Sequence, residues 1–281
     1  MGHLLSFDAS SIRDDYKELR NAYYEDGGLI IRKLLPLKLI SKLAKKVIRI
    51  VYLIDESVVK NCPVRVNTNS VKAASKILQE VERNRPGTQS IVYDEMTHTP
   101  LMYEIAANES ILRVSEHLLS KELLIQPKLL VLMSMPNETW HLARWHQDFY
   151  YNEGSENTCT VYAPLQFVNA ENGGLLVAKN ELKRGLLPHA DNNYREPTKW
   201  HTLSQEVVKS FSDTTQIEMS AGDVLFLHML TPHSALVNKS EDVRFVLNLR
   251  YQDMTDNRFH ANNWRTKNIP HARNALNRNK S

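Results

Sequence analysis

The stretch that decides the fold is IEMSAGDVLFLHMLTPHS, residues 217–234. It contains the strand-like segment 224–227 and most of a second one, 216–219, with the turn Ala221-Gly222-Asp223 between them. Short apolar runs bounded by turn residues predict β-strands. The same pattern continues on both sides of this stretch, so the fold is read outward from it.

Similar strand candidates fill the second half of the chain. Turn residues such as Asn172-Gly173-Gly174 and Asn238-Lys239-Ser240 separate them. The expected strands are 123–135, 158–168, 174–178, 216–219, 224–227 and 244–251. Short strands in series without helices between them indicate an antiparallel sandwich or barrel. Residues 180–213 have weak periodicity and are expected to form a long loop.

The first half of the chain is mainly helical in its pattern. Apolar residues recur at helical spacing after Pro36, with lysines between them, which predicts an amphipathic helix up to Ile54. A second helix is expected over 71–84, and a pair over 101–119. With no repeat or linker, we expect one domain spanning 1–281. Its expected parts are a helical part of about 1–120, a β core of about 121–255 and a basic tail, 256–281.

Composition places the chain among ordinary globular proteins. It has 281 residues, of which 42% are hydrophobic and 24% charged, and a net charge of +3. That charge is not a nucleic-acid signature. The two cysteines, Cys62 and Cys159, cannot build a disulfide framework and favour a reducing compartment. Without an export signal or an uncharged apolar stretch, we expect a cytoplasmic protein that acts on a small molecule.

The residues His146-Gln147-Asp148 carry the sharpest chemical signal. On an extended segment, side chains two residues apart point the same way, so His146 and Asp148 can meet one metal ion. His233 is the candidate for the third ligand. Two neutral imidazoles and one carboxylate form a facial triad, which leaves coordination positions open and suits Fe(II).

Arg244 begins the last strong strand and is a candidate to bind a carboxylate, the alternative being a surface ion pair. Because strand side chains alternate, Arg250 faces the interior if Arg244 does. An inward Arg250 would then hold either an anionic substrate group or a carboxylate of the barrel. Arg144, Trp145 and Tyr150 flank the metal motif. Of these, Tyr150 is expected to line the pocket and Trp145 to pack in the core.

Several of these motifs, in this order, resemble the phytanoyl-CoA dioxygenase family. His146-Gln147-Asp148 matches the proximal motif of that family, and residues 217–234 look like its distal-histidine segment. The stretches 24–31, 172–177 and 238–251 are similar to its opening, its glycine-rich turn and its arginine strand. The resemblance covers about residues 20–252. One departure is the sequence 178–182, which lacks the Pro-Gly-Ser-His segment found in many members.

This resemblance implies an α+β fold with a mainly β core, a double-stranded β-helix of the jelly-roll or cupin type, with packed N-terminal helices. It implies Fe(II), 2-oxoglutarate and O2, with ascorbate as a supporting reductant. Carried over by position, His146, Asp148 and His233 would bind iron. Arg244 would hold the distal carboxylate of 2-oxoglutarate, with Tyr162 and Gln126 as further cosubstrate contacts. The candidate substrate contacts are Tyr150, Arg144, Arg250 and Trp145.

The predicted activity is a 2-oxoglutarate-dependent dioxygenase that hydroxylates an unactivated C–H bond of a small metabolite, with release of succinate and CO2. The two candidate arginines and the basic tail favour an anionic metabolite. Two alternatives stay open at this point. The same iron centre could catalyse desaturation, cyclisation or epimerisation, or the chain could be a non-catalytic β-barrel binding protein.

Overall fold

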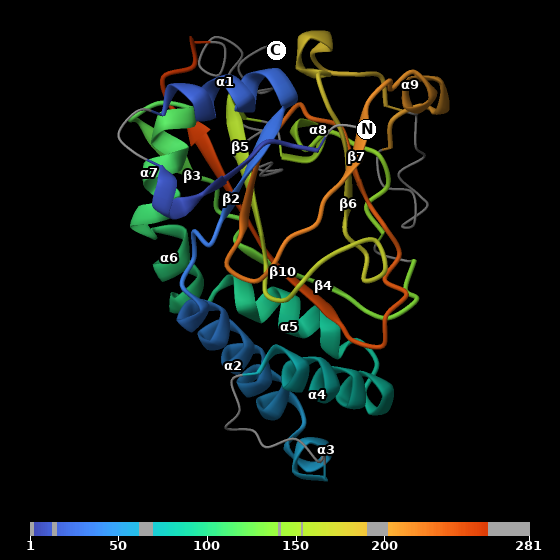
Figure 1. The fold of residues 1–281 in the computed structure, drawn as a ribbon. Helices are drawn as coiled ribbons and strands as arrows, with labels where there is room; N and C mark the ends of the chain where they lie inside the picture. The colour runs from blue at the N-terminus through green and yellow to red at the C-terminus, as the bar shows by residue number, and fades with distance from the viewer. Residues whose placement is uncertain are drawn as a thin grey trace, which may run out of the picture.

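The computed structural model describes residues 3–12, 16–61, 70–139, 142–152, 154–189 and 202–257, without the side chains of residues 58, 61, 150 and 151. Cys62 and the basic tail from residue 258 onward lie outside these ranges. Figure 1 shows strands in the middle of the molecule, with helices at their side and beneath their lower ends. The architecture is mixed α/β with a sheet-rich core.

The central element is β10 (Arg244–Asp253), in which every residue is buried. Successive side chains of a strand point to opposite faces. Phe245 and Leu247 therefore enter the large core beneath the helices, whereas Val246 enters a second core. The polar residues of β10 that share the face of Val246 are Arg244, Asn248, Arg250 and Gln252. Both arginines thus face the second core.

The strand β10 belongs to a seven-stranded sheet with the order β1-β2-β8-β5-β10-β3, in which β4 also pairs with β10. The β1–β2 pair is parallel and the other pairs of this sheet are antiparallel. Its other strands are β1 (Ser6–Asp8), β2 (Gly28–Arg32), β3 (Leu123–Ile125), β4 (Leu130–Ser134), β5 (Thr158–Pro164) and β8 (Val224–His228).

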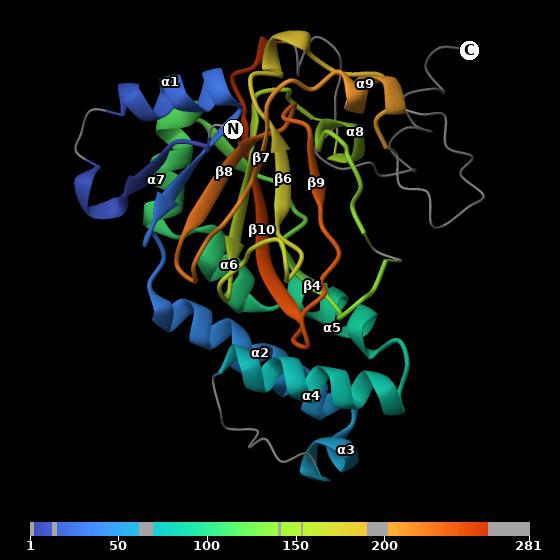
Figure 2. The ribbon, with the colours of Figure 1, turned by 45° about the vertical axis from the view of Figure 1, so that its right-hand side comes forward.

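A second sheet of three strands, β7 (Thr214–Gln216), β6 (Leu175–Ala178) and β9 (His233–Ala235), has the order β7-β6-β9. Figure 2 shows these strands in front of the larger sheet. The second core contains Leu225 and Val246 from the larger sheet together with Val177 from the smaller one. The two sheets therefore face each other, and the polar residues of β10 point into the space between them.

The helices cover the outer face and one end of the larger sheet (Figures 1 and 2). The helix α5 contacts β4, and α2 packs against both α4 and α5, while α1 lies beside β2 and α7. Their bounds are α1 (Lys17–Asp26), α2 (Leu37–Ile54), α3 (Glu56–Asn61), α4 (Val71–Asn84), α5 (Thr88–Thr97), α6 (Pro100–Ala106) and α7 (Glu109–Leu118). Together they complete the large core.

The predicted helices of the first half are confirmed. In α2 the apolar positions are buried and the lysines lie on the opposite face, as the periodicity predicts. The helix over 71–84 has the predicted bounds. The pair over 101–119 is α6, which has Pro100 in its first turn, and α7, whose N-cap Asn108 accepts hydrogen bonds from two backbone amides. Among the described residues, no helix is long and apolar enough to cross a membrane.

Four sequence expectations need correction. The strand expected over 216–219 lies earlier, as β7, and Met219 forms an isolated bridge with Val168 instead. The segment 123–135 is not one strand but β3 and β4, which follow each other along the same edge of β10 and are separated at Gln126-Pro127. Residues 28–32, assigned to the helical half, form β2 in the larger sheet. The long loop 180–213 contains the short helices η2 (Leu182–Arg184) and α9 (Gln205–Lys209).

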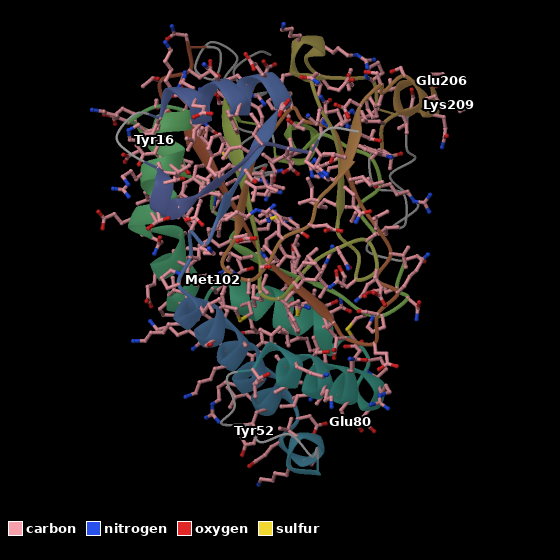
Figure 3. The ribbon with its side chains drawn as sticks, in the orientation of Figure 1. Tyr16, Tyr52, Glu80, Met102, Glu206 and Lys209 are labelled. Carbon is pink, nitrogen blue, oxygen red and sulfur yellow. The ribbon has the colours of Figure 1, made fainter. Side chains whose placement is uncertain are left out.

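The helix α9 carries a small satellite core outside the two main ones. Val207 packs there with Leu187 and Leu203, and Trp145 lies against this cluster. Glu206 and Lys209 project outward from α9 (Figure 3). Since Trp145 directly precedes His146, the satellite core stabilises the chain segment that carries the first candidate metal ligand.

Candidate metal centre

Two backbone hydrogen bonds join the segments that carry the candidate histidines. The amide of His146 donates to the carbonyl of His233 at 3.0 Å, and the amide of His233 donates to the carbonyl of His146 at 3.0 Å. This isolated antiparallel bridge brings the imidazole centroids to 4.2 Å from each other. Residues far apart in the sequence are thereby held as neighbours between the two sheets.

Each imidazole is oriented by a backbone carbonyl two residues before it. The Nδ1 atom of His146 lies 2.7 Å from the carbonyl oxygen of Arg144, and Nδ1 of His233 lies 3.0 Å from that of Thr231. A carbonyl only accepts, so Nδ1 carries a proton in both rings, which leaves Nε2 as the nitrogen available to a metal. That tautomer is the one that binds a metal through Nε2.

The surroundings of His233 favour the neutral form of its imidazole. Burial and the nearby His146 lower the pKa of its imidazole to about 4. A neutral imidazole is the form that coordinates a metal. At neutral pH this side chain is therefore a competent ligand without having to lose a proton.

Asp148 is 4% exposed and directly precedes α8 (Phe149–Asn152), in a turn rather than a continuous strand. Its Oδ2 accepts a hydrogen bond from Thr160 at 2.6 Å, and Nη2 of Arg250 lies 3.3 Å from both carboxylate oxygens. Burial alone would raise the pKa of Asp148, but Arg250, followed by the two histidines, holds it well below its usual value. The carboxylate is ionised.

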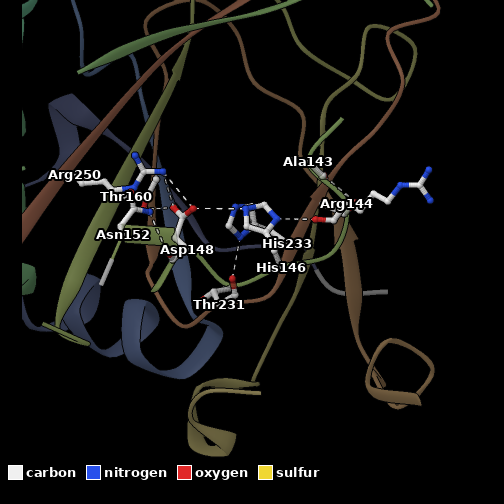
Figure 4. A network of polar contacts seen from close by, with 10 residues as sticks. Ala143, Arg144, His146, Asp148, Asn152, Thr160, Thr231, His233 and Arg250 are labelled. Carbon is white, nitrogen blue, oxygen red and sulfur yellow. Dashed lines mark hydrogen bonds and ion pairs between the residues drawn. The ribbon is translucent and has the colours of Figure 1, made fainter. Parts of the chain in front are cut away.

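The three side chains form one cluster of possible ligands. One ligand atom from each of His146, Asp148 and His233 lies within 4.8 Å of the others, and all three residues are buried. Nε2 of His146 lies 3.6 Å from Oδ1 of Asp148. Figure 4 shows the imidazoles on one side of the Asp148 carboxylate, with Arg250 and Thr160 on the other side. Two imidazoles and one carboxylate suit Fe(II) and leave positions for further ligands.

Arg244 and Tyr162 lie together in the same interior. Nη1 of Arg244 is 3.4 Å from the Tyr162 hydroxyl, and Nη2 donates to Oγ of Ser134 at 2.5 Å. The guanidinium is 4% exposed, and its Nε has no hydrogen-bond partner. Among the described residues, Arg244 has no carboxylate within ion-pair distance. A buried cation with neutral neighbours is ready to receive an anion.

Gln126 lies at the other end of the β10 row, close to Gln252. Its Nε2 is 3.4 Å from Oε1 of Gln252, and its backbone amide donates to the carbonyl of Arg250 at 2.9 Å. Gly154, with a φ of +90° that only glycine readily adopts, leaves no room there, since an added Cβ would lie 2.4 Å from Oε1 of Gln252. Gln126 is therefore nearer to Arg250 and Gln252 than to the Arg244 end of the strand.

The structure separates the candidate substrate contacts. Arg250 takes the second alternative of the sequence analysis, since it pairs with the carboxylate of Asp148. Arg144 is exposed and its side chain points away from both imidazoles (Figure 4). Trp145 packs against Phe211, with ring centroids 5.3 Å apart. The side chain of Tyr150 lies outside the part of the chain that the structure describes.

Three side chains that contact the candidate site residues are absent from the sequence interpretation. Thr160 shares the face of Tyr162 on β5 and pairs with Arg250 across the sheet, so strand alternation could have identified it. Ser134 is opposite Arg244 in the register of β4 and β10, which sequence alone does not reveal. Gln147 was quoted only as the residue between two ligands, and no pattern signals its contacts.

Comparisons with known proteins agree with this geometry. The family model described as phytanoyl-CoA dioxygenase (PhyH) matches residues 23–246. No curated protein sequence matches the chain.

Solved structures resemble the chain along most of its length. The epimerase SnoN in complex with Fe3+, alpha ketoglutarate and nogalamycin RO has a TM-score of 0.59 at 21% identity, covering 85% of this chain and 84% of that one. The alpha-ketoglutarate-dependent carbocyclase SnoK has a TM-score of 0.52 at 17% identity, covering 88% and 87%. The nickel complex of the non-heme monooxygenase ThoJ has a TM-score of 0.52 at 15% identity, covering 84% and 77%. At these identities the likeness is one of fold.

Proposed function

Because the chain belongs to the phytanoyl-CoA dioxygenase family, we propose that it is an Fe(II)- and 2-oxoglutarate-dependent oxygenase. Its proposed reaction is the hydroxylation of an unactivated C–H bond in a small anionic metabolite, with release of succinate and CO2. The observation that carries this proposal is the buried cluster of His146, Asp148 and His233, with ligand atoms within 4.8 Å of one another. The two facing sheets are then the double-stranded β-helix of the family.

The donor set fits the metal on three counts. Both imidazoles have their Nδ1 atoms engaged by carbonyls, the Asp148 carboxylate is ionised, and Arg250 and Thr160 fix its orientation. In this proposal His146, Asp148 and His233 hold iron. Iron with bound 2-oxoglutarate supplies the activation of O2 that a side chain cannot perform. The protein contributes the ligand geometry and a site shielded from water.

Arg244 is assigned to the distal carboxylate of 2-oxoglutarate. It is buried on the interior face of β10, with Ser134 and Tyr162 orienting its guanidinium and no carboxylate near it in the described part of the chain. An incoming dicarboxylate would supply the missing negative charge through charge-assisted hydrogen bonds. The Tyr162 hydroxyl then lies beside the same carboxylate. Gln126 is kept as a further polar contact of this proposal.

The charges in the interior favour an anionic substrate. Among the described residues, the buried charged side chains between the sheets are Arg244, Arg250 and Asp148, whereas other buried charges such as Lys179 and Asp223 have partners elsewhere. With Fe(II) and the 2-oxoglutarate dianion added, one positive charge is left without a counter-charge. Uncompensated buried charge is unfavourable. A carboxylate or another oxyanion on the substrate would neutralise it.

Unpartnered polar atoms give that anion a place. Among the described residues, Nε and Nη1 of Arg250 and Nε2 of Gln252 are donors without a hydrogen-bond partner. Both side chains share the interior face of β10, and Figure 4 shows Arg250 on the side of Asp148 away from the histidines. Arg250 and Gln252 are therefore proposed substrate contacts, and Tyr150 is kept as a third one from the sequence prediction. A cytoplasmic location, where Fe(II) and 2-oxoglutarate are supplied, is part of the same proposal.

The test is an anaerobic titration of the metal-free protein with Fe(II) and then 2-oxoglutarate. We expect a weak visible charge-transfer band that requires both additions and is absent from the Asp148→Ala variant. The Asp223→Ala variant, which removes a buried carboxylate paired with Arg32 far from the cluster, is the matched control. Without a band in the wild-type protein, the binding-protein alternative replaces the oxygenase.

The reaction outcome is decided by the product. The solved structures that resemble this chain include an epimerase, a carbocyclase and a monooxygenase. We would screen small carboxylates and phosphorylated metabolites for stimulated succinate release and weigh each product by mass spectrometry. Gain of one oxygen atom supports hydroxylation. Loss of two hydrogens indicates desaturation or cyclisation, and an unchanged mass with changed retention indicates epimerisation.

A further inference from the structure

Gln147, the residue between two candidate ligands, has a fully buried side chain whose amide bonds in three directions. Its Oε1 accepts a hydrogen bond from the backbone amide of Leu187 at 2.7 Å. Its Nε2 donates to the carbonyl of Leu230 at 2.6 Å and to the carbonyl of Gly185 at 2.9 Å. The acceptor and both N–H donors of the amide are therefore in use, which fixes its orientation.

These contacts join the two ligand segments to a third segment. Gln147 is flanked by His146 and Asp148, and Leu230 precedes Thr231, whose carbonyl orients His233. The amide therefore links both ligand segments directly. It adds a buried side-chain cross-link to the backbone hydrogen bonds between these segments, which include the bridge between His146 and His233.

The third segment, residues 185–187, is open to solvent on its other side. Gly185 and Leu230 line a surface groove of about 780 Å³, together with Tyr24 and Lys183. Gly185 has φ of +67°, where the chain turns away from η2, and an added Cβ there would meet nothing within 4 Å. Leu187 is anchored in the satellite core beside Trp145, but Gly185 has no such packing. The Gln147 amide bonds Gly185 directly to the ligand segment.

We infer that Gln147 is a positioning residue. Its single amide fixes both the position of residues 185–187 and the geometry of the metal ligands. The inference rests on the proposed function for its metal part. A buried amide whose hydrogen bonds are all formed orients its neighbours more strongly than packing alone. The reason is that any other orientation leaves a buried donor or acceptor without a partner. Second contacts of this kind tune metal affinity without touching the metal.

The experiment compares Gln147→Met with Gln166→Met. Gln166 is a matched control because its amide also bridges two backbone groups, donating to the carbonyl of Val243 and accepting from the amide of Phe245, neither of which belongs to a segment that carries a candidate metal ligand. Two readouts are used. Hydrogen exchange of the peptide that contains Leu187 reports whether residues 185–187 stay in position. Titration with Co(II) reports the ligand geometry through the visible spectrum.

For Gln147→Met we expect faster exchange at Leu187, Co(II) affinity lower by about 10- to 100-fold and an altered Co(II) spectrum. Gln166→Met should lower thermal stability alone, with wild-type exchange at Leu187 and a wild-type spectrum. Exchange and spectrum in Gln147→Met that match those of Gln166→Met overturn the inference, since a residue that only supports folding gives that result.

A second variant keeps the test informative if Gln147→Met does not fold. Gln147→Glu keeps the acceptor for the Leu187 amide but places an oxygen against the carbonyls of Leu230 and Gly185. In this variant we expect the exchange protection at Leu187 to stay closer to wild type than the Co(II) spectrum does. A wild-type spectrum with lost protection at Leu187 would contradict the inference. If the wild-type protein itself binds neither Co(II) nor Fe(II), the proposed function fails and the metal part of the inference fails with it. The exchange result then still tests whether Gln147 fixes the position of residues 185–187.

Discussion

Arg244 and Arg250 lie on the same face of the same strand, both buried, yet the two ends of the row have opposite surroundings. Arg250 faces the carboxylate of Asp148, with Nη2 3.3 Å from both oxygens. Among the described residues, Arg244 has no carboxylate beside it, and its guanidinium contacts the hydroxyl groups of Ser134 and Tyr162. One cation therefore has a carboxylate partner in the described part of the protein, whereas the other has neutral partners there.

The comparison shows that the partner, and not the residue type or its burial, determines what a buried arginine does. Paired with Asp148, the guanidinium of Arg250 stabilises and orients a candidate metal ligand. In the proposed function, the guanidinium of Arg244, which has no described carboxylate beside it, receives an anion that compensates its desolvation. The two ends of β10 can therefore be perturbed separately, and the perturbations should differ in kind.

The largest effect, on Fe(II) binding, is expected when Arg250 loses its carboxylate partner and so comes to resemble Arg244. Asp148→Asn leaves Arg250 as unpaired as Arg244 and removes the charged ligand, so we expect Fe(II) binding to be lost. Isothermal titration with Fe(II) under anaerobic conditions measures this. Asp223→Asn, at a buried carboxylate paired with Arg32, should bind Fe(II) as the wild type does. Tight Fe(II) binding by Asp148→Asn would remove this carboxylate from the site.

The next effect concerns stability. Arg250→Met leaves the Asp148 carboxylate buried without its cation, which should destabilise the metal-free protein by about 3–5 kcal/mol. A divalent metal would supply the missing positive charge, so Fe(II) should restore more stability to this variant than to the wild type. Denaturant unfolding with and without Fe(II) measures both quantities. Equal stability of Arg250→Met and wild type in the metal-free state would contradict the pairing.

A pH dependence follows from the histidine at the paired end. The pKa of His233 is about 4 in the folded protein, through burial and the proximity of His146, and about 6.5 when unfolded. The unfolded chain therefore binds the proton first as the pH falls. The metal-free protein should keep this stabilisation above pH 6.5 and lose on the order of 3 kcal/mol as the pH approaches 4. Denaturant unfolding of wild type and His233→Gln should show a smaller loss for the variant over this range.

The smallest effect is expected at the unpaired end. Arg244→Met strands no carboxylate, so the unfolding free energy should change by less than about 1 kcal/mol. Binding of 2-oxoglutarate to the Fe(II) form should weaken by about 1.5–3 kcal/mol, as expected for loss of a charge-assisted pair. The charge-transfer band at increasing 2-oxoglutarate concentration measures the affinity. An unchanged affinity would exclude Arg244 from the cosubstrate site.

Local patterns in the sequence predict a large part of this site. The spacing of His146 and Asp148, the distal His233 and the alternation from Arg244 to Arg250 are properties of short segments, so they can be interpreted without a structure. The pairing of Arg250 with Asp148 could be stated only as one of two alternatives, because it depends on how separate segments meet. The prediction that Tyr162 contacts the cosubstrate rests on the family resemblance, and the structure places its hydroxyl 3.4 Å from Nη1 of Arg244.

The missed features depend on long-range contacts. Nothing local reveals that β2 joins β8 or that β3 and β4 share one edge of β10, since their residues resemble any short apolar strand. Gln147 was missed because its partners, Gly185, Leu187 and Leu230, are brought to it only by the tertiary fold. A glutamine carries no periodicity that would indicate such a role.

The pairing of β2 with β8 also has a consequence for how the chain is made. Gly28 is opposite Leu227 in this antiparallel pair, so β2 leaves the ribosome long before its neighbour is synthesised. Until then the apolar residues Leu29, Ile30 and Ile31 have no strand beside them on that edge, and contacts between such distant residues form slowly. We therefore expect nascent chains that stop short of residue 224 to be prone to aggregation and to be retained by chaperones, with release following synthesis of β8.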